Sequence, residues 1–118
     1  MFFKNVKTTS EVLGLCVVAE QQTLNVISGE TTATIEFIKF LKLFEPTLAK
    51  VNKLNKNSRW FELCMTIMKQ FDEVLVKGLK EQQSLKLTMA DIGMVATNAI
   101  AAFEKAGLYE REKDGIQD

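Results

Sequence analysis

The stretch 58–83, SRWFELCMTIMKQFDEVLVKGLKEQQ, carries the clearest helical pattern in the chain. Ser58 is a favoured N-cap residue, and no proline occurs in the rest of the stretch. At about 100° per residue, one face collects Trp60, Leu63, Cys64, Ile67, Phe71, Val74, Leu75 and Gly78. Neighbouring apolar residues widen this arc to roughly 200°, whereas a surface helix needs only about 100°. The pattern predicts a helix that runs through the middle of a bundle or keeps a second face for a partner.

The segment before residue 30 is also predicted to be helical. Its apolar residues recur at helical spacing, and Ser28-Gly29 supplies a stop signal, so we expect a helix over about 10–27. A β-hairpin near residues 23–37 is the alternative. Residues 24–27 and 31–37 are rich in β-branched side chains and flank a Ser-Gly-Glu turn.

The next segment runs from Glu30 to about Phe44, with Thr31 or Thr32 as its expected N-cap. Pro46 comes next, and it either kinks this helix or stands in the first turn of another. A third segment is then expected to continue to about Leu54 before an Asn-rich loop.

The last helix is predicted to begin at Thr88, its expected N-cap, and to end at Gly107. Residues from about 108 are mostly charged and are expected to fray. The sequence thus predicts an all-α, four- to five-helix bundle that forms a single domain over residues 1–118.

Small residues mark places where helices could cross closely. Gly93, Thr97 and Ala101 succeed one another at intervals of four, which places them on one ridge of the last helix. Gly78 lies inside the long helix, where glycine costs roughly 1 kcal/mol relative to alanine. A close crossing or a kink at Gly78 would account for that cost, and a tolerated defect is the alternative.

Composition excludes several classes of protein. The chain has 118 residues, no histidine and two cysteines, Cys16 and Cys64. Ser–His–Asp and Cys–His enzymes and His-ligated metal sites are therefore excluded, and two thiols are too few for structural zinc. No glycine-rich phosphate-binding motif occurs. We expect a protein that is not an enzyme and has no metal or cofactor, with both thiols reduced and buried.

The location expected from the sequence is the cytoplasm, the host cytoplasm or an assembled particle. The longest uncharged run, residues 92–103, has 12 residues, fewer than the about 20 that a transmembrane helix needs. No membrane association is expected.

The leading functional hypothesis is a helical protein–protein interaction module that works as an assembly factor, adaptor or inhibitor. The wide apolar arc of the long helix would supply the contact, with a homodimer or higher homo-oligomer expected. The chain resembles, in a general way, the small helical accessory proteins of phages and mobile elements. The predicted contact residues are Phe61, Met65, Met68, Val76 and Leu79.

Nucleic-acid binding is the alternative hypothesis. Residues 1–59 hold 8 basic and 5 acidic side chains, while residues 60–118 hold 7 and 10. A basic strip beside an aromatic ring could hold phosphates or stack a base. The zero net charge of the whole chain argues against it, because nonspecific binders are usually basic overall. The strip consists of Lys50, Lys53, Lys56, Arg59 and Trp60.

Overall fold

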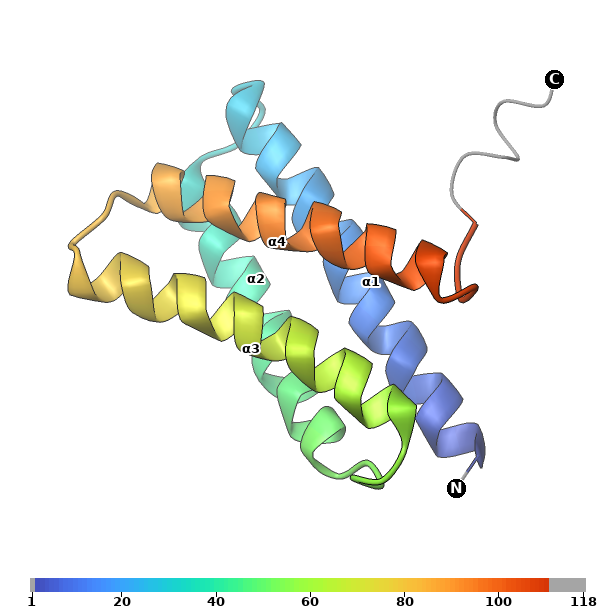
Figure 1. Cartoon of the computed structure of the whole chain (residues 1–118). Helices are drawn as coiled ribbons and strands as arrows, with labels where there is room; N and C mark the ends of the chain where they lie inside the picture. The colour runs from blue at the N-terminus through green and yellow to red at the C-terminus, as the bar shows by residue number, and fades with distance from the viewer. Residues whose placement is uncertain (1, 111–118) are drawn as a thin grey trace, which may run out of the picture.

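The computed structural model describes the backbone of residues 2–110 and the side chains of residues 6–110. All regular secondary structure in this range is α-helical, so the predicted all-α bundle is confirmed, with four helices (Figure 1). They are α1 (Phe2–Ile27), α2 (Ala33–Asn52), α3 (Arg59–Lys80) and α4 (Leu85–Lys105).

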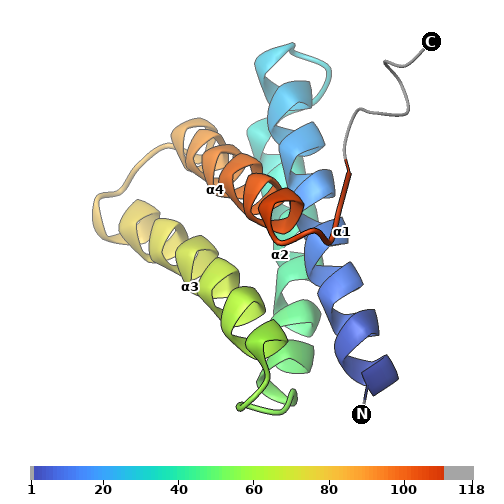
Figure 2. The same ribbon diagram turned by 45° about the vertical axis from the view of Figure 1, so that its right-hand side comes forward.

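The helices form two antiparallel hairpins, α1 with α2 and α3 with α4, which cross one another (Figures 1 and 2). The principal-axis extents are 41, 39 and 19 Å, which fits two layers of helices. Between the layers lies a core in which Phe40 stacks on Phe44 at 5.5 Å between ring centroids and tilts against Phe71 at 5.2 Å. Met68, Ile92, Ile100 and Phe103 complete its fully buried centre.

The β-hairpin alternative is wrong for these residues. Residues 24–27 form the last turn of α1, and residues 33–37 begin α2. Gly29, at φ 82°, ends α1. The Gly29 N–H donates a hydrogen bond to the Val26 carbonyl, and the Glu30 N–H donates one to the Asn25 carbonyl, a pattern typical of glycine at the end of a helix. The Thr32 hydroxyl then accepts the Ile35 N–H at 3.2 Å and starts α2. These caps and the packing of both helices override the weak β-propensity of the segment.

Helix α2 continues through Pro46, so the two segments predicted around this proline form one helix and a fifth helix is absent from residues 2–110. An internal proline costs about 3 kcal/mol. Phe40, Phe44 and Val51 are buried on either side of it. Their burial, at about 1.5–3 kcal/mol per large apolar side chain, offsets that cost.

The predicted caps of the later helices are partly right. Ser58 caps α3 as predicted, its hydroxyl accepting the Trp60 N–H at 3.0 Å. Thr88 does not cap α4: Ser84 does, and Thr88 is buried one turn inside the helix. Gly107, at φ 77°, lies directly after the C-cap of α4.

The predicted frayed tail is described only at its start. Leu108 and Tyr109 are half-buried and pack against the core. Residues 111–118, the rest of that tail, lie outside the described part of the chain.

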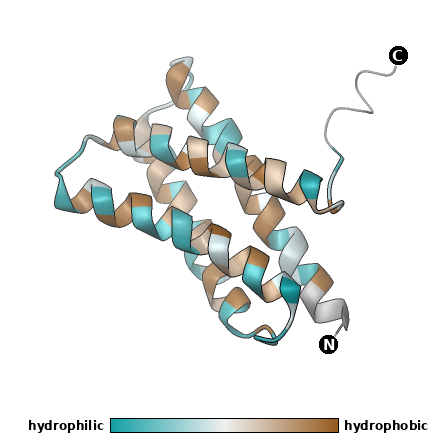
Figure 3. Cartoon of the chain, in the orientation of Figure 1, coloured by the Kyte–Doolittle hydropathy of each residue, from teal (hydrophilic) through white to brown (hydrophobic). Residues whose placement is uncertain are grey.

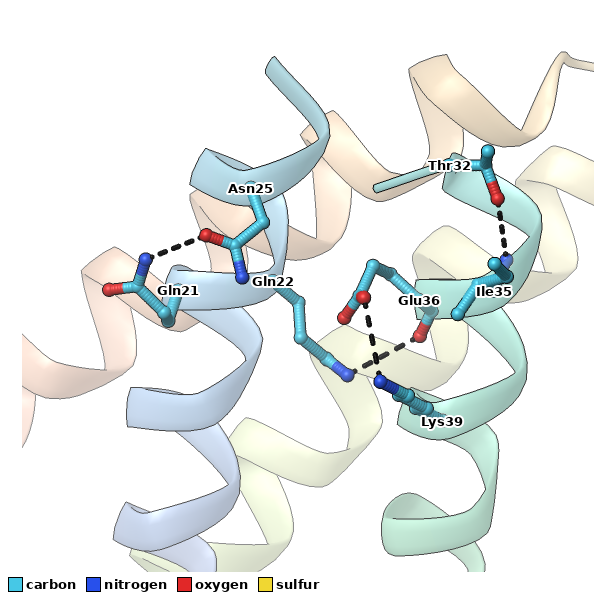
Figure 4. Close-up of polar contacts among 7 residues, drawn as sticks. All are labelled: Gln21, Gln22, Asn25, Thr32, Ile35, Glu36 and Lys39. Atoms are coloured by element: carbon cyan, nitrogen blue, oxygen red, sulfur yellow. Dashed lines mark hydrogen bonds and ion pairs between the residues drawn. The ribbon is translucent and has the colours of Figure 1, made fainter. Parts of the chain in front are cut away.

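Polar side chains join α1 to α2 near their shared turn (Figure 4). The buried Gln22 amide donates to the Glu36 carbonyl at 3.4 Å, and the buried Glu36 carboxylate lies 3.9 Å from the Lys39 ammonium. The Gln22–Glu36 bond joins the two helices, so a sliding of α1 along α2 would break it and leave a buried amide without a partner, whereas the Glu36–Lys39 pair lies within α2.

Two glycines allow helices to approach closely. A Cβ at position 93 would lie 2.6 Å from Thr23 Oγ1 and 2.7 Å from its Cγ2, so α4 contacts α1 through bare backbone. A Cβ at position 78 would lie 2.7 Å from Thr88 Oγ1, which gives the same arrangement between α3 and α4. A close crossing is therefore present at Gly78 and at Gly93, whereas Thr97 and Ala101, the other two residues of the predicted ridge, are exposed.

Alanine substitutions at Gly93 and at Gly14 separate the effect of helix propensity on stability from the effect of close helix packing. We expect Gly93→Ala to lower the free energy of unfolding by about 1–3 kcal/mol, because the new methyl group displaces the buried Thr23 side chain. Gly14→Ala is the matched control, since nothing lies within 4 Å of a Cβ there. It should raise stability by up to about 1 kcal/mol. Urea unfolding checks both, and equal stabilisation by the two substitutions would contradict the close crossing.

Candidate interaction surface

The predicted contact residues on α3 do not form one exposed surface. Met68 is fully buried in the core and cannot reach a partner in this fold, which corrects its place in the predicted set. Phe61 and Met65 are half-buried and pack against the same core. Val76 and Leu79 are exposed, at 41% and 81%. The wide apolar arc of α3 is thus largely covered within the chain by α1, α2 and α4.

A larger apolar surface lies between α1 and α4, where a groove of about 630 Å³ opens. Leu24 and Ile27 from α1 and Met94 from α4 stand at its sides, with exposures of 53%, 67% and 65%. Thr23 and Gly93, both buried, also line it. The close crossing of the two helices thus lies within the groove.

The groove continues past Ile27 and Ala90 into a second hollow of about 200 Å³ beside Leu87, which is 59% exposed. Hydrophobic residues occupy the last turn of α1 and the first turn of α4, whose ends lie close together (Figure 3). We call the two hollows together the α1/α4 groove. It is lined by Glu20, Thr23, Leu24, Val26, Ile27, Ser84, Lys86, Leu87, Met89, Ala90, Gly93, Met94, Thr97 and Asn98.

Sequence spacing explains the groove. A stripe on α4 consists of the half-buried Ala90 and the exposed residues on either side of it, at intervals of three, four, three and four: Leu87, Ala90, Met94, Thr97 and Ala101. On α1, Val17, Glu20, Leu24 and Ile27 repeat intervals of three and four. This heptad spacing is typical of a helix face that packs on another helix. The groove was not predicted, because a helical wheel assigns the apolar residues of each helix to a single core face.

Charge is sparse along the groove. Among its lining residues only Glu20 and Lys86 are formally charged, and they have opposite signs. The Glu20 carboxylate accepts a hydrogen bond of 2.8 Å from the Thr97 hydroxyl, which ties α1 to α4 at the edge. An apolar partner surface therefore meets little charge that it would have to desolvate.

The predicted basic strip is divided by the fold. Lys50 lies 3.1 Å from the Glu11 carboxylate of α1 and is neutralised by it. Lys53, Lys56 and Arg59 are exposed. The Arg59 guanidinium lies over the Trp60 ring, 5.1 Å from its centroid, so the ring is not open for a base to stack on that side. Lys7 of α1, which was not part of the predicted strip, joins Lys50 and Lys53 around a hollow.

Both cysteines are free and buried. Burial raises the pKa of Cys16 from its ordinary value of 9.0 to about 12, and burial also raises the pKa of Cys64, whose thiol contacts the Thr9 hydroxyl at 3.8 Å. A nucleophilic cysteine needs the opposite shift. Neither thiol is therefore activated for catalysis.

Metal-binding clusters and membrane-spanning helices are both absent from residues 2–110. No group of three or more His, Cys, Asp or Glu side chains there is arranged to hold a metal ion. None of the four helices is long and apolar enough to cross a membrane.

Comparisons with protein families, with curated proteins and with solved structures found no match to this chain. The fold places the chain in the class of four-helix bundles, and its distinguishing feature is an apolar groove on one side. Because one fold can host many functions, this groove is the feature that bears on function.

The buried thiols predict a specific pH dependence. Because the folded pKa of Cys16 is raised, the unfolded chain loses its thiol proton first, and stability falls as the pH rises from 9 towards 12. The loss from this one group approaches about 1.4 kcal/mol per pH unit. Urea unfolding at several alkaline pH values should show a shallower loss for Cys16→Ala, whose lysines titrate as in the unaltered chain. Identical pH dependence in the two proteins would contradict the burial of this thiol.

Proposed function

We propose that this protein is a non-enzymatic interaction module that forms a homodimer through the α1/α4 groove. The observation that carries the proposal is the set of four exposed apolar side chains along the groove: Leu24, Ile27, Leu87 and Met94. Contiguous apolar surface of this kind is uncommon on monomers and marks interaction sites. The module would act as an assembly factor, adaptor or inhibitor.

A second copy of the chain is the occupant that suits this groove best. A two-fold dimer places one patch against itself, so the patch must present both projections and hollows. Here Ile27 and Met94 project at about two-thirds exposure beside the hollows of the groove. The opposite charges of Glu20 and Lys86 leave the lining without net charge, so two copies meet without repulsion.

The pairing of copies would assemble four helices, α1 and α4 from each. Their heptad-spaced stripes would form the seam, in the manner of a four-helix bundle. Burial of the exposed apolar area supplies the driving force, and the polar edge formed by Glu20 and Thr97 sets the register. The cytoplasm is the compartment we propose, because both cysteines are free thiols.

Light scattering coupled to size exclusion tests the proposal. The unaltered chain is expected to be a dimer. Met94→Lys and Ile27→Lys should each weaken dimerisation at least about tenfold, since a central interface side chain contributes more than about 1.4 kcal/mol. Thermal unfolding by circular dichroism should show that both variants keep the fold, because neither side chain belongs to the core.

Leu79→Lys is the matched control, since Leu79 is the most exposed apolar residue of α3 and part of the contact first predicted from sequence. This variant should remain dimeric. A chain that stays monomeric at about 1 mM would refute the dimer. Loss of the dimer in Leu79→Lys alone would place the interface on α3 instead.

A further inference from the structure

A second surface lies at the end of the bundle that holds the N-terminus of α1, the C-terminus of α2 and the N-terminus of α3 (Figures 1 and 2). Five basic residues come from these three elements and from the loop between α2 and α3. We call this set the basic end; it consists of Lys7, Lys50, Lys53, Lys56 and Arg59. It does not overlap the α1/α4 groove.

The basic end keeps most of its charge. Glu11 neutralises Lys50, but no other ion pair within 4 Å involves these five residues in the described part of the chain. Lys7 and Lys53 flank a hollow of about 280 Å³ that Thr8 and the paired Glu11 and Lys50 also line. Two ammonium groups and a concave surface are thus available to an anionic group there.

The basic end keeps a positive electrostatic potential even though the net charge of the whole chain is zero. Interactions between exposed charges are largely screened beyond about 10 Å at 0.1 M salt. The longest axis of the bundle is 41 Å. Acidic residues at the α3–α4 turn, such as Glu81, lie at the end of α3 opposite Arg59 and therefore contribute little to the potential at the basic end. Glu62 and Glu104 lie nearer to it, since Glu62 is in the first turn of α3 and Phe103 shares a hollow with Trp60.

The stacking of Arg59 on Trp60 decides what kind of anion fits. Single-strand binders combine a basic groove with aromatic faces on which bases stack. Here the guanidinium covers one face of the half-buried Trp60 ring, which also lines a hollow with Phe103 and Leu108. A base cannot stack on the covered face, whereas the charge of Arg59 remains exposed to a phosphate.

We propose that the basic end binds the phosphate backbone of double-stranded nucleic acid without reading its sequence. Lys7, Lys53, Lys56 and Arg59 would each meet one phosphate, and Lys50 stays with Glu11. Lysines outnumber arginine four to one in the set, which suits point-charge contacts with phosphates and not bidentate contacts with bases.

The test is fluorescence anisotropy with a labelled duplex of about 20 base pairs. With four contacts, the logarithm of the affinity should fall with the logarithm of salt at a slope of about −3.6, or about 150-fold between 50 and 200 mM. Replacing Lys53 and Lys56 together by Glu should lower the affinity at least tenfold and make the slope shallower. Both side chains are exposed, so the fold should survive.

The matched control replaces Lys69 and Lys80 of α3 by Glu, which changes the net charge equally at exposed positions away from the basic end. This variant should keep most of the affinity. Equal loss in the two variants would overturn the proposal, as would the absence of binding at 50 mM salt. Binding to phosphatidylserine vesicles without binding to the duplex would also overturn it, in favour of a membrane surface.

Discussion

The contact between Gly93 and Thr23 is the constraint on which the arrangement of the bundle depends. At this point α4 presents bare backbone to α1, and any side chain larger than hydrogen would displace the Thr23 side chain or push the helices apart. The Thr23 hydroxyl lies 2.9 Å from the Met89 carbonyl of α4 and 3.1 Å from the Ala19 carbonyl of its own helix. Close approach and hydrogen bonding thus fix where the two helices meet.

The groove is a consequence of that constraint. Since α1 and α4 are held together at a point inside it, the apolar residues that flank the crossing cannot all turn into the same core. Ile92 and Ala96 face inward and are fully buried, while Met94 remains largely exposed. The Gly78–Thr88 contact ties α3 to the opposite side of α4, which prevents α3 from covering this surface.

The positions and ends of the helices were easier to predict from the sequence than the way in which the helices pack on one another. Ser58, Thr32 and Gly107 act where local chemistry predicts, because a cap depends on residues within one turn. Pro46 lies inside a helix because distant partners bury Phe44 and Val51 on either side of it. Local signals in the sequence carry no information about such partners.

The same limit explains the error at the candidate site. A helical wheel gives the width of the apolar arc of α3, but not which neighbours cover it, so buried Met68 and exposed Leu79 look equivalent. The groove is formed by two apolar stripes on helices far apart in sequence, Leu24 with Ile27 and Leu87 with Met94. The heptad spacing of each stripe is visible in the sequence. That the two stripes lie side by side depends on the crossing at Gly93, which the sequence does not show.

The central claim is that two copies meet through this groove, and the most direct measurement is isotope-filtered NMR on an equal mixture of labelled and unlabelled chains. Methyl groups of Leu24, Ile27 and Met94 should show contacts between chains. Contacts between chains at Val76 and Leu79, or none at any methyl group, would contradict the account.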